Sequence, residues 1–154
     1  MPNLPVEIGK GVVALHSDSA GATARAGAKA LMAPLGLVEW VDVARFDAVT
    51  ALAGSGPAFV YRFIDALAAA GAAVGIPTDQ ALRLALATVE GGALLAGRSS
   101  EPPATLAEKV ASPGGSTRKG LDVLDADAAL VKLLTATLEA SERRNAEMAA
   151  AARG

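Results

Sequence analysis

Small side chains set the strongest limit on what this chain can fold into. Alanine accounts for 37 of the 154 residues, whereas Phe, Trp and Tyr together make up only 3%. A core assembled from Ala, Leu and Val is typical of helices that approach one another closely. Because 52% of the residues are hydrophobic and 19% are charged, the composition excludes intrinsic disorder. The sequence therefore predicts a mainly α-helical chain with one domain, or one domain and part of another.

Residues that commonly carry catalysis are scarce. The chain has no cysteine and one histidine, His16, which excludes disulfides, cysteine-ligated metals, thiol nucleophiles and a histidine-rich metal site. We interpret His16 as a surface or satisfied core histidine.

The charge and hydropathy patterns exclude further classes of function. A net charge of −2 gives no sign of the basic surface that binds nucleic acid. The apolar stretch 57–76 contains Arg62 and Asp65 one turn apart, which favours a buried helix over a membrane span. With no signal peptide at the start, we expect a cytoplasmic protein.

Residues 1–43 differ in pattern from the rest. A β-branched run over 8–16 and an alternating segment over 37–42 predict two strands, and residues 20–35 between them predict a helix. The segment 17–19 supplies N-cap candidates for that helix. This strand, helix and strand form half of an α/β architecture, which has little stability on its own.

From residue 46 onward the pattern is helical. We expect a run of helices over residues 46–52, 57–74, 79–96 (capped by Thr78), 103–110 and 126–149. The leucines of 79–96 surround the helix axis, which predicts burial in a subunit interface as well as in the chain's own core. Three acidic residues, Asp122, Asp125 and Asp127, lack the glycine and glutamate of a calcium loop, so we interpret them as an acidic bias at a helix start.

Two glycine-rich segments are candidates for a binding site. In residues 112–117 (S-P-G-G-S-T), glycines allow close approach of the backbone, and a helix beginning near Thr117 would offer free N–H groups to a carboxylate or phosphate. Residues 50–57 (T-A-L-A-G-S-G-P) have similar character. From composition alone, an ordinary interhelical turn is the favoured interpretation of both segments, and neither matches a nucleotide phosphate loop.

Together the two segments resemble pyrroline-5-carboxylate reductase. Residues 47–59 (D-A-V-T-A-L-A-G-S-G-P-A-F) and 110–117 (V-A-S-P-G-G-S-T) resemble the family signature, residues 72–77 fit its G-L-P turn, and residues 1–5 (M-P-N-L-P) are similar to its M-P-N-T-P motif. Leu4 departs from the threonine common in the family. The resemblance implies that residues 1–43 are the end of an NAD(P)-binding Rossmann domain. It also implies that residues 44–154 form an all-helical substrate-binding and dimerisation domain, similar to the C-terminal domain of 6-phosphogluconate dehydrogenase.

The resemblance also implies roles for individual residues. Thr50 is expected near the imine nitrogen and the nicotinamide as a polar contact or proton relay. The substrate carboxylate is expected in the loop formed by Ser112, Gly114, Gly115, Ser116 and Thr117. The cofactor side of the site is expected at Asn3, Pro5, Gly54 and Ser55. No metal is expected, because hydride transfer to a protonated imine mainly requires positioning.

Three hypotheses follow. The first is an NADPH- or NADH-dependent reductase of 1-pyrroline-5-carboxylate that forms L-proline and self-associates as an intertwined homodimer or higher oligomer. On this hypothesis the chain lacks the glycine-rich phosphate turn, holds the dinucleotide weakly and is inactive alone. The second is a non-catalytic helical oligomerisation module or truncated paralogue. The third is a reductase of a different small acid.

Overall fold

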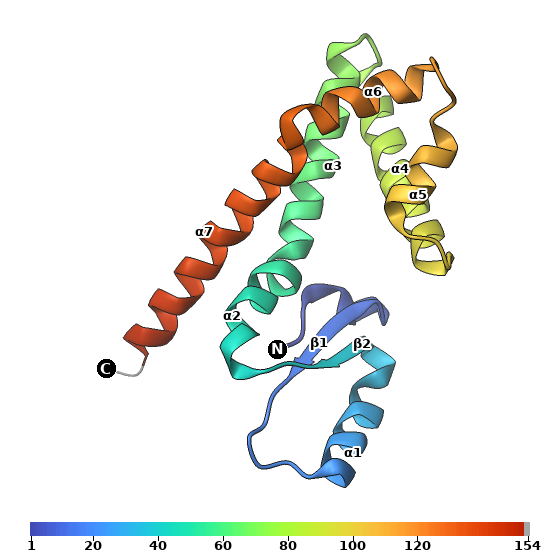
Figure 1. Ribbon diagram of the computed structural model, residues 1–154. Coiled ribbons are helices and arrows are strands. Elements are labelled where there is room, and N and C mark those ends of the chain that lie inside the picture. Colours follow the sequence, from blue (N-terminus) through green and yellow to red (C-terminus); the bar gives the residue numbers. More distant parts are fainter. Residues whose placement is uncertain (153–154) are drawn as a thin grey trace. The chain divides into compact units, whose positions relative to one another are not determined.

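The chain, described here by a computed structural model over residues 1–152, forms two compact units (Figure 1). One unit comprises Met1–Val60 and Leu134–Gly154, and the other comprises Tyr61–Leu133. Most of the chain is helical, and one small parallel sheet lies near the N-terminus. This architecture confirms the predicted mainly α fold preceded by a β-α-β portion.

The sheet of the first unit contains two parallel strands. Strand β1 (Gly11–Leu15) pairs in register with β2 (Gly36–Trp40), and α1 (Ala22–Met32) connects them. The N-terminal segment lines the other side of β1: the terminal ammonium group of Met1 donates to the carbonyl of Ala14 over 2.8 Å. The central side chains Val13 and Ala14 are 3% and 1% exposed, so this small sheet buries its own core.

The link from α1 to β2 needs a glycine. Gly36 has φ +133°, and a Cβ there would collide with the backbone of Gly11 on the paired strand. The start of α1 differs from the prediction, because Gly21 occupies the N-cap and no side chain caps the helix. The hydroxyl of Ser17 accepts instead from the N–H groups of Ser19 and Ala20 within the loop. This local turn removes Ser17 from the helix start.

The rest of the first unit surrounds a distorted helical turn. Helix α2 (Phe46–Val49) continues into a π-helical turn over Thr50–Gly54, before α3 (Gly56–Ala73) begins. Helix α7 (Ala129–Ala151) contacts the residue that ends this turn, because the hydroxyls of Ser55 and Ser141 lie 3.1 Å apart. Ala51 is fully buried.

The second unit has a core of alanine. It contains most of α3, with α4 (Thr78–Arg98), α5 (Pro103–Val110) and α6 (Ser116–Asp125). Its buried residues are all alanines: Ala68, Ala81, Ala85 and Ala111. A Cβ added to Gly71 would lie 3.3 Å from the Cβ of Ala81, so α3 and α4 approach closely at that point. The predicted close approach of helices through alanine is confirmed here, whereas the leucines expected in the same core are exposed in the single chain.

Two helix starts in the second unit differ from the predictions. Thr78 is the first residue of α4 and Pro77 holds the cap position, so Thr78 does not cap the helix. The predicted acidic bias at the last helix is wrong for Asp122 and Asp125, because both lie within α6 and bind Arg118 there. Asp127 lies in the short turn before α7, with φ +50°.

Large apolar side chains remain uncovered on the helices. On α4, Leu82 is 45% exposed and Leu95 is 68% exposed, and Leu84, Leu86 and Leu94 are also exposed. The chain's own core therefore covers the alanine face of α4 and leaves its leucines in solvent. None of the helices among residues 1–152 combines the length and the apolar character that a membrane crossing requires.

Candidate functional site

The loop between α5 and α6 is pinched by a tight turn. The N–H of Gly115 donates to the carbonyl of Ser112 over 2.9 Å, and Gly114 has φ +72°. A Cβ on Gly115 would lie 2.5 Å from the Ser112 hydroxyl oxygen and 3.1 Å from the Ser112 carbonyl oxygen. This close approach brings the Ser112 side chain next to the first turn of α6.

The first turn of α6 presents unpaired N–H groups. The helix begins at Ser116, close to the predicted start near Thr117. Within residues 1–152, backbone carbonyls accept from the N–H groups of Gly115 and Lys119, and none accepts from Ser116, Thr117 or Arg118. No side chain caps this end of the helix. Three N–H donors and the positive end of a ten-residue helix are therefore arranged to bind an anion beside a loop that also carries hydroxyl groups.

Charged side chains flank this loop on its helices. The guanidinium of Arg118 donates to Glu108 on α5 and to Asp122 and Asp125 on α6. A hydrogen bond to the Glu108 carboxylate raises the pKa of Arg118 above its ordinary value. Arg118 is therefore a fixed cation whose charge these three carboxylates neutralise. Sequence reasoning missed both Arg118 and Glu108, although an acid and an arginine that bracket a glycine-rich loop were a usable signal.

Thr50 lies in the first unit, at the start of the π-helical turn. Its hydroxyl donates to the carbonyl of Phe46 over 2.8 Å. π-Helical turns within α-helices occur often at functional positions. Because the hydroxyl proton is used inside the helix, the Thr50 oxygen is arranged to accept a hydrogen bond from a ligand.

The residues expected on the cofactor side make contacts within the first unit. The Asn3 amide donates to the carbonyl of Ala53 over 2.9 Å, and its oxygen accepts from the N–H of Val12 over 2.8 Å. The Asn3 side chain thus joins the π-helical turn to β1. Met1 covers Gly54, since a Cβ there would lie 3.3 Å from the Met1 sulfur. These contacts bring three of the four predicted residues, Asn3, Gly54 and Ser55, near Thr50.

Pro5, the fourth predicted residue, lies in a short 3-10 helix over Leu4–Ile8, where its carbonyl accepts from the N–H of Lys10. The bonds of Asn3, Pro5 and Ser55 are all made inside the protein. No cradle of free donors for a dinucleotide pyrophosphate is found among them. Their predicted cofactor contacts stay predictions.

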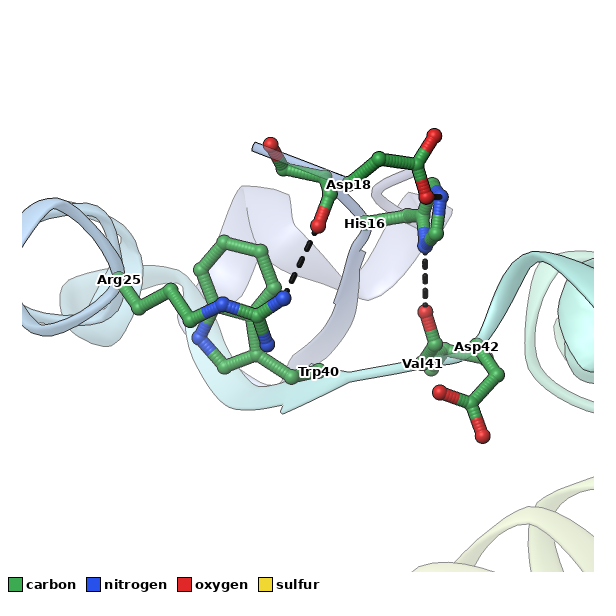
Figure 2. A pocket seen from close by; sticks show the side chains of 7 residues that line it. His16, Asp18, Arg25, Trp40, Val41 and Asp42 are labelled. Carbon is green, nitrogen blue, oxygen red and sulfur yellow. Dashed lines mark hydrogen bonds and ion pairs between the residues drawn. The ribbon is translucent and has the colours of Figure 1, made fainter. Parts of the chain in front are cut away.

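A pocket of about 240 Å³ lies where β1 and β2 end (Figure 2). The guanidinium of Arg25 lies 4.5 Å from the centroid of the Trp40 ring and donates to the carbonyls of Ser17 and Ala20. His16 bonds the carbonyl of Val41 through Nδ1 over 2.9 Å, and its Nε2 lies 3.2 Å from Asp18. The polar groups that line this pocket are bonded to one another, and these bonds hold together the segments that follow β1 and β2. His16 is a bonded surface histidine, as predicted.

Comparisons with known proteins agree with the residue motifs. A family model described as pyrroline-5-carboxylate reductase dimerisation matches residues 44–148. The chain is 44% identical over 126 residues to the pyrroline-5-carboxylate reductase of Aquifex aeolicus, a match that covers 81% of this chain and 48% of the relative. It is 38% identical over 145 residues to the Arabidopsis thaliana enzyme, with coverages of 93% and 52%.

Solved structures agree with the fold as well. A pyrroline-5-carboxylate reductase from Coxiella burnetii matches with a TM-score of 0.89 and 31% identity, over 96% of this chain and 55% of that one. A Plasmodium falciparum pyrroline carboxylate reductase with NADP bound matches with a TM-score of 0.79 and 28% identity, over 94% and 59%. The chain spans about half the length of the curated relatives it matches. From the family match over residues 44–148 and these similarities, the chain belongs to the pyrroline-5-carboxylate reductase family.

Proposed function

We propose that this chain supplies the substrate-binding and self-association parts of an enzyme that reduces 1-pyrroline-5-carboxylate to L-proline. The observation that carries the proposal is the start of α6, where unpaired N–H groups lie beside the hydroxyls of a glycine-pinched loop. On this proposal residues 1–43 are the end of the cofactor domain, and residues 44–154 are the helical domain. The family of the chain and the names of its relatives support the reaction.

The loop is assigned to the substrate carboxylate. The unpaired N–H groups of Ser116 and Thr117 and the hydroxyls of Ser112, Ser116 and Thr117 provide neutral donors, and the dipole of α6 favours a negative charge. Arg118 does not take this role in the proposal, because three protein carboxylates already bind its guanidinium. Neutral donors hold the carboxylate without adding a positive charge beside a cationic imine.

Thr50 is assigned to the imine nitrogen. Its hydroxyl proton is directed to the carbonyl of Phe46, so its oxygen accepts from the N–H of a protonated imine. This bond orients the ring and keeps the nitrogen protonated, which makes the imine carbon electrophilic. The chain's own residues supply position and protonation state, and the hydride would come from a reduced nicotinamide when it is bound.

The nicotinamide cofactor, NADPH or NADH, is assigned to the complete enzyme. The Plasmodium falciparum protein that is similar to this chain has NADP bound. The sequence has no glycine-rich phosphate turn, and the bonds of Asn3, Pro5 and Ser55 are made inside the protein. The 154 residues alone are therefore proposed to hold the dinucleotide weakly and to be inactive or nearly so. The complete enzyme is proposed to be cytoplasmic.

The partner in self-association is a second copy of the chain. The leucines of α4 are exposed in the single chain although its alanines are buried. The family description names dimerisation, which fits burial of these leucines by another copy. A purely structural oligomerisation module is the second candidate, since the same exposed leucines support it without any chemistry.

An activity assay separates these candidates. The purified chain is mixed with NADPH and 1-pyrroline-5-carboxylate, first alone and then with the cofactor-binding half of a pyrroline-5-carboxylate reductase. Turnover only in the second mixture supports the proposal. Turnover by the chain alone refutes the proposed inactivity, and absence of turnover in both mixtures favours the structural module.

Three variants test the assigned residues in the reconstituted enzyme. Thr117→Val removes a donor to the carboxylate, and we expect kcat/KM to fall about 10- to 100-fold, as for other hydrogen bonds to charged groups. Thr50→Val is expected to act similarly, whereas Thr50→Ser retains the hydroxyl. Thr23→Val, on the exposed face of α1, is the matched control. Equal activity of Thr117→Val and the control would remove the loop from the proposed site.

A further inference from the structure

The Arg118 guanidinium bridges two helices at the base of the loop 112–117. Each of its three nitrogens meets a different carboxylate: Nη1 lies 2.7 Å from Glu108, Nε lies 2.9 Å from Asp122, and Nη2 lies 3.2 Å from Asp125. Its side chain is only 25% exposed, although it bears a full charge. A guanidinium presents donors in a fixed planar fork, so these bonds determine where its head lies.

The three carboxylates differ in their position in the chain. Asp122 and Asp125 belong to α6, as does Arg118 itself, whereas Glu108 belongs to α5. Within residues 1–152, the Arg118–Glu108 contact is the one side-chain hydrogen bond that connects α5 to α6. It therefore fixes the distance between the last turn of α5 and the first turn of α6.

Everything between those two turns is the proposed carboxylate loop. The N–H of Ala111 donates to the Glu108 carbonyl, Gly115 donates to Ser112, and Lys119 donates to Gly115. The loop is thus a chain of short-range turns whose two ends meet at one ion pair. Gly114 and Gly115 have no side chains that could hold the loop from within.

We propose that Arg118 is a positioning residue that holds the loop 112–117 in its carboxylate-binding shape through Glu108, without touching the substrate. This inference rests on the proposed function of the loop. Asp122 and Asp125 hold the guanidinium on α6, and Glu108 brings α5 to it. The negative partners also keep the cation from competing with the neutral donors for the substrate.

The clamp predicts a specific kinetic signature. The substrate carboxylate keeps its charge throughout hydride transfer, so a loosened loop weakens binding of the substrate and of the transition state equally. We expect Arg118→Ala and Glu108→Gln each to raise KM about fivefold, the upper range for a partly exposed ion pair, with kcat within about twofold of the wild type. Because both break the same bridge, the double variant is expected to be no worse than either single one.

Asp65→Asn is the matched control, since it removes a carboxylate from an exposed ion pair with Arg62 within α3 and leaves the Arg118 bridge intact. Its KM is expected to stay near the wild-type value. A direct role gives the opposite pattern: if Arg118 bound the substrate carboxylate itself, Glu108→Gln would free it and lower KM. That result, or an unchanged KM in both Glu108→Gln and Arg118→Ala, would overturn the clamp.

Amide hydrogen exchange tests the clamp without any turnover. In the wild-type chain and in Glu108→Gln, exchange is measured at the N–H groups of 111 and 115, which are bonded within the loop. We expect exchange there to become several-fold faster in Glu108→Gln and to stay unchanged in Asp65→Asn. Equal exchange in all three chains would contradict the clamp even if the loop binds substrate.

The two proposals can fail separately. If Thr117→Val impairs the enzyme but Glu108→Gln changes neither KM nor exchange, the loop assignment stands and the clamp is wrong. If Glu108→Gln accelerates exchange but Thr117→Val leaves kcat/KM unchanged, Arg118 orders the loop but the loop does not bind the substrate. Arg118→Lys retains the charge and lacks the fork, so an intermediate KM is expected if Arg118→Ala does not fold.

Discussion

The β1–β2 sheet buries its central valines, whereas helix α4 leaves its leucines exposed. In the sheet, Val13 and Val38 are each 3% exposed. On α4, Ala81 and Ala85 are buried, whereas Leu82 is 45% exposed and Leu95 is 68% exposed. The sheet covers its largest central side chains within one chain, and α4 covers only its smallest. The exposed leucines of α4 therefore indicate an interaction face, which a second apolar surface would cover.

The largest effect is expected from charges placed on α4. Leu82→Glu combined with Leu86→Glu puts two carboxylates on the exposed side of the helix, where burial of each leucine by a partner contributes about 1.5–3 kcal/mol. We expect self-association to weaken at least about 100-fold, which corresponds to about 2.7 kcal/mol. Mass in solution across protein concentrations provides the measurement.

The matched control for this variant is Leu31→Glu on α1, where Leu31 is 73% exposed. Its mass is expected to equal that of the wild type. If the wild-type chain is a monomer at micromolar concentration, the interpretation of the α4 surface is wrong. If Leu31→Glu also dissociates the oligomer, the contrast between the two regions disappears.

An effect of comparable size is expected at the sheet. Gly36→Ala places a Cβ against the backbone of Gly11 and forces alanine to φ +133°, so unfolding free energy is expected to fall by about 3 kcal/mol or more. Gly27→Ala is the control, because a Cβ there meets nothing within 4 Å in helix α1. It is expected to gain roughly 0.5–1 kcal/mol. Urea unfolding measures both, and equal stabilities would show that β2 adjusts to a side chain.

A smaller loss is expected from Asn3→Ala. The variant leaves the Ala53 carbonyl and the Val12 N–H without the partners that Asn3 provides, at a cost of about 1–3 kcal/mol. Loss of the link between β1 and the π-helical turn is also expected to reduce kcat/KM in the reconstituted enzyme, because Thr50 lies in that turn. Unfolding and kinetics are measured on the same preparation. A kinetic loss without a change in stability would favour a direct cofactor contact by Asn3.

The smallest effect concerns pH and the start of α4. A hydrogen bond from Arg83 lowers the pKa of Asp79 below its ordinary value of 3.8. A carboxyl whose pKa is lower in the folded state stabilises the fold above the unfolded-state pKa, and this contribution is lost as pH falls through the folded-state pKa. Arg83→Ala is therefore expected to lower stability slightly at pH 7 and to make it less sensitive to pH below about 4.

Stability curves from pH 2 to pH 7 measure this difference. Arg98→Ala, in the last turn of the same helix, is the control and is expected to leave the acid slope unchanged. An acid slope in Arg83→Ala identical to that of the wild type would assign the lowered pKa of Asp79 to the helix backbone instead.

Much of the fold follows from local patterns in the sequence. The two strands, α1, α3 and α5 lie within a few residues of their predicted positions, because glycine and proline punctuate these segments clearly. The predictions of helix caps were less accurate. The Ser17 hydroxyl accepts a hydrogen bond within its own loop, and Thr78 is the first residue of α4. The start of α6 at Ser116 lies close to the helix start considered near Thr117, whereas the extent of this helix to Asp125 was not predicted.

For the candidate site, the glycine-rich loop and Thr50 were found as segments, whereas their hydrogen bonds were not. No local pattern indicates that the Thr50 proton points to Phe46, or that Asn3 joins Ala53 to Val12 across 50 residues. Arg118 was overlooked because its decisive partner, Glu108, lies on another helix. Contacts of this kind depend on how the chain folds back on itself.

Composition determined by itself that this protein is helical, has a core of small side chains and lacks cysteine or histidine-cluster chemistry. These properties depend only on which side chains are present and on the intrinsic preferences of short segments. Only the tertiary structure decided which side of α4 is covered and which N–H groups of α6 remain unpaired. It also decided that Arg118 faces a carboxylate on α5, because burial and pairing arise from residues that are distant in sequence and meet only in the folded chain.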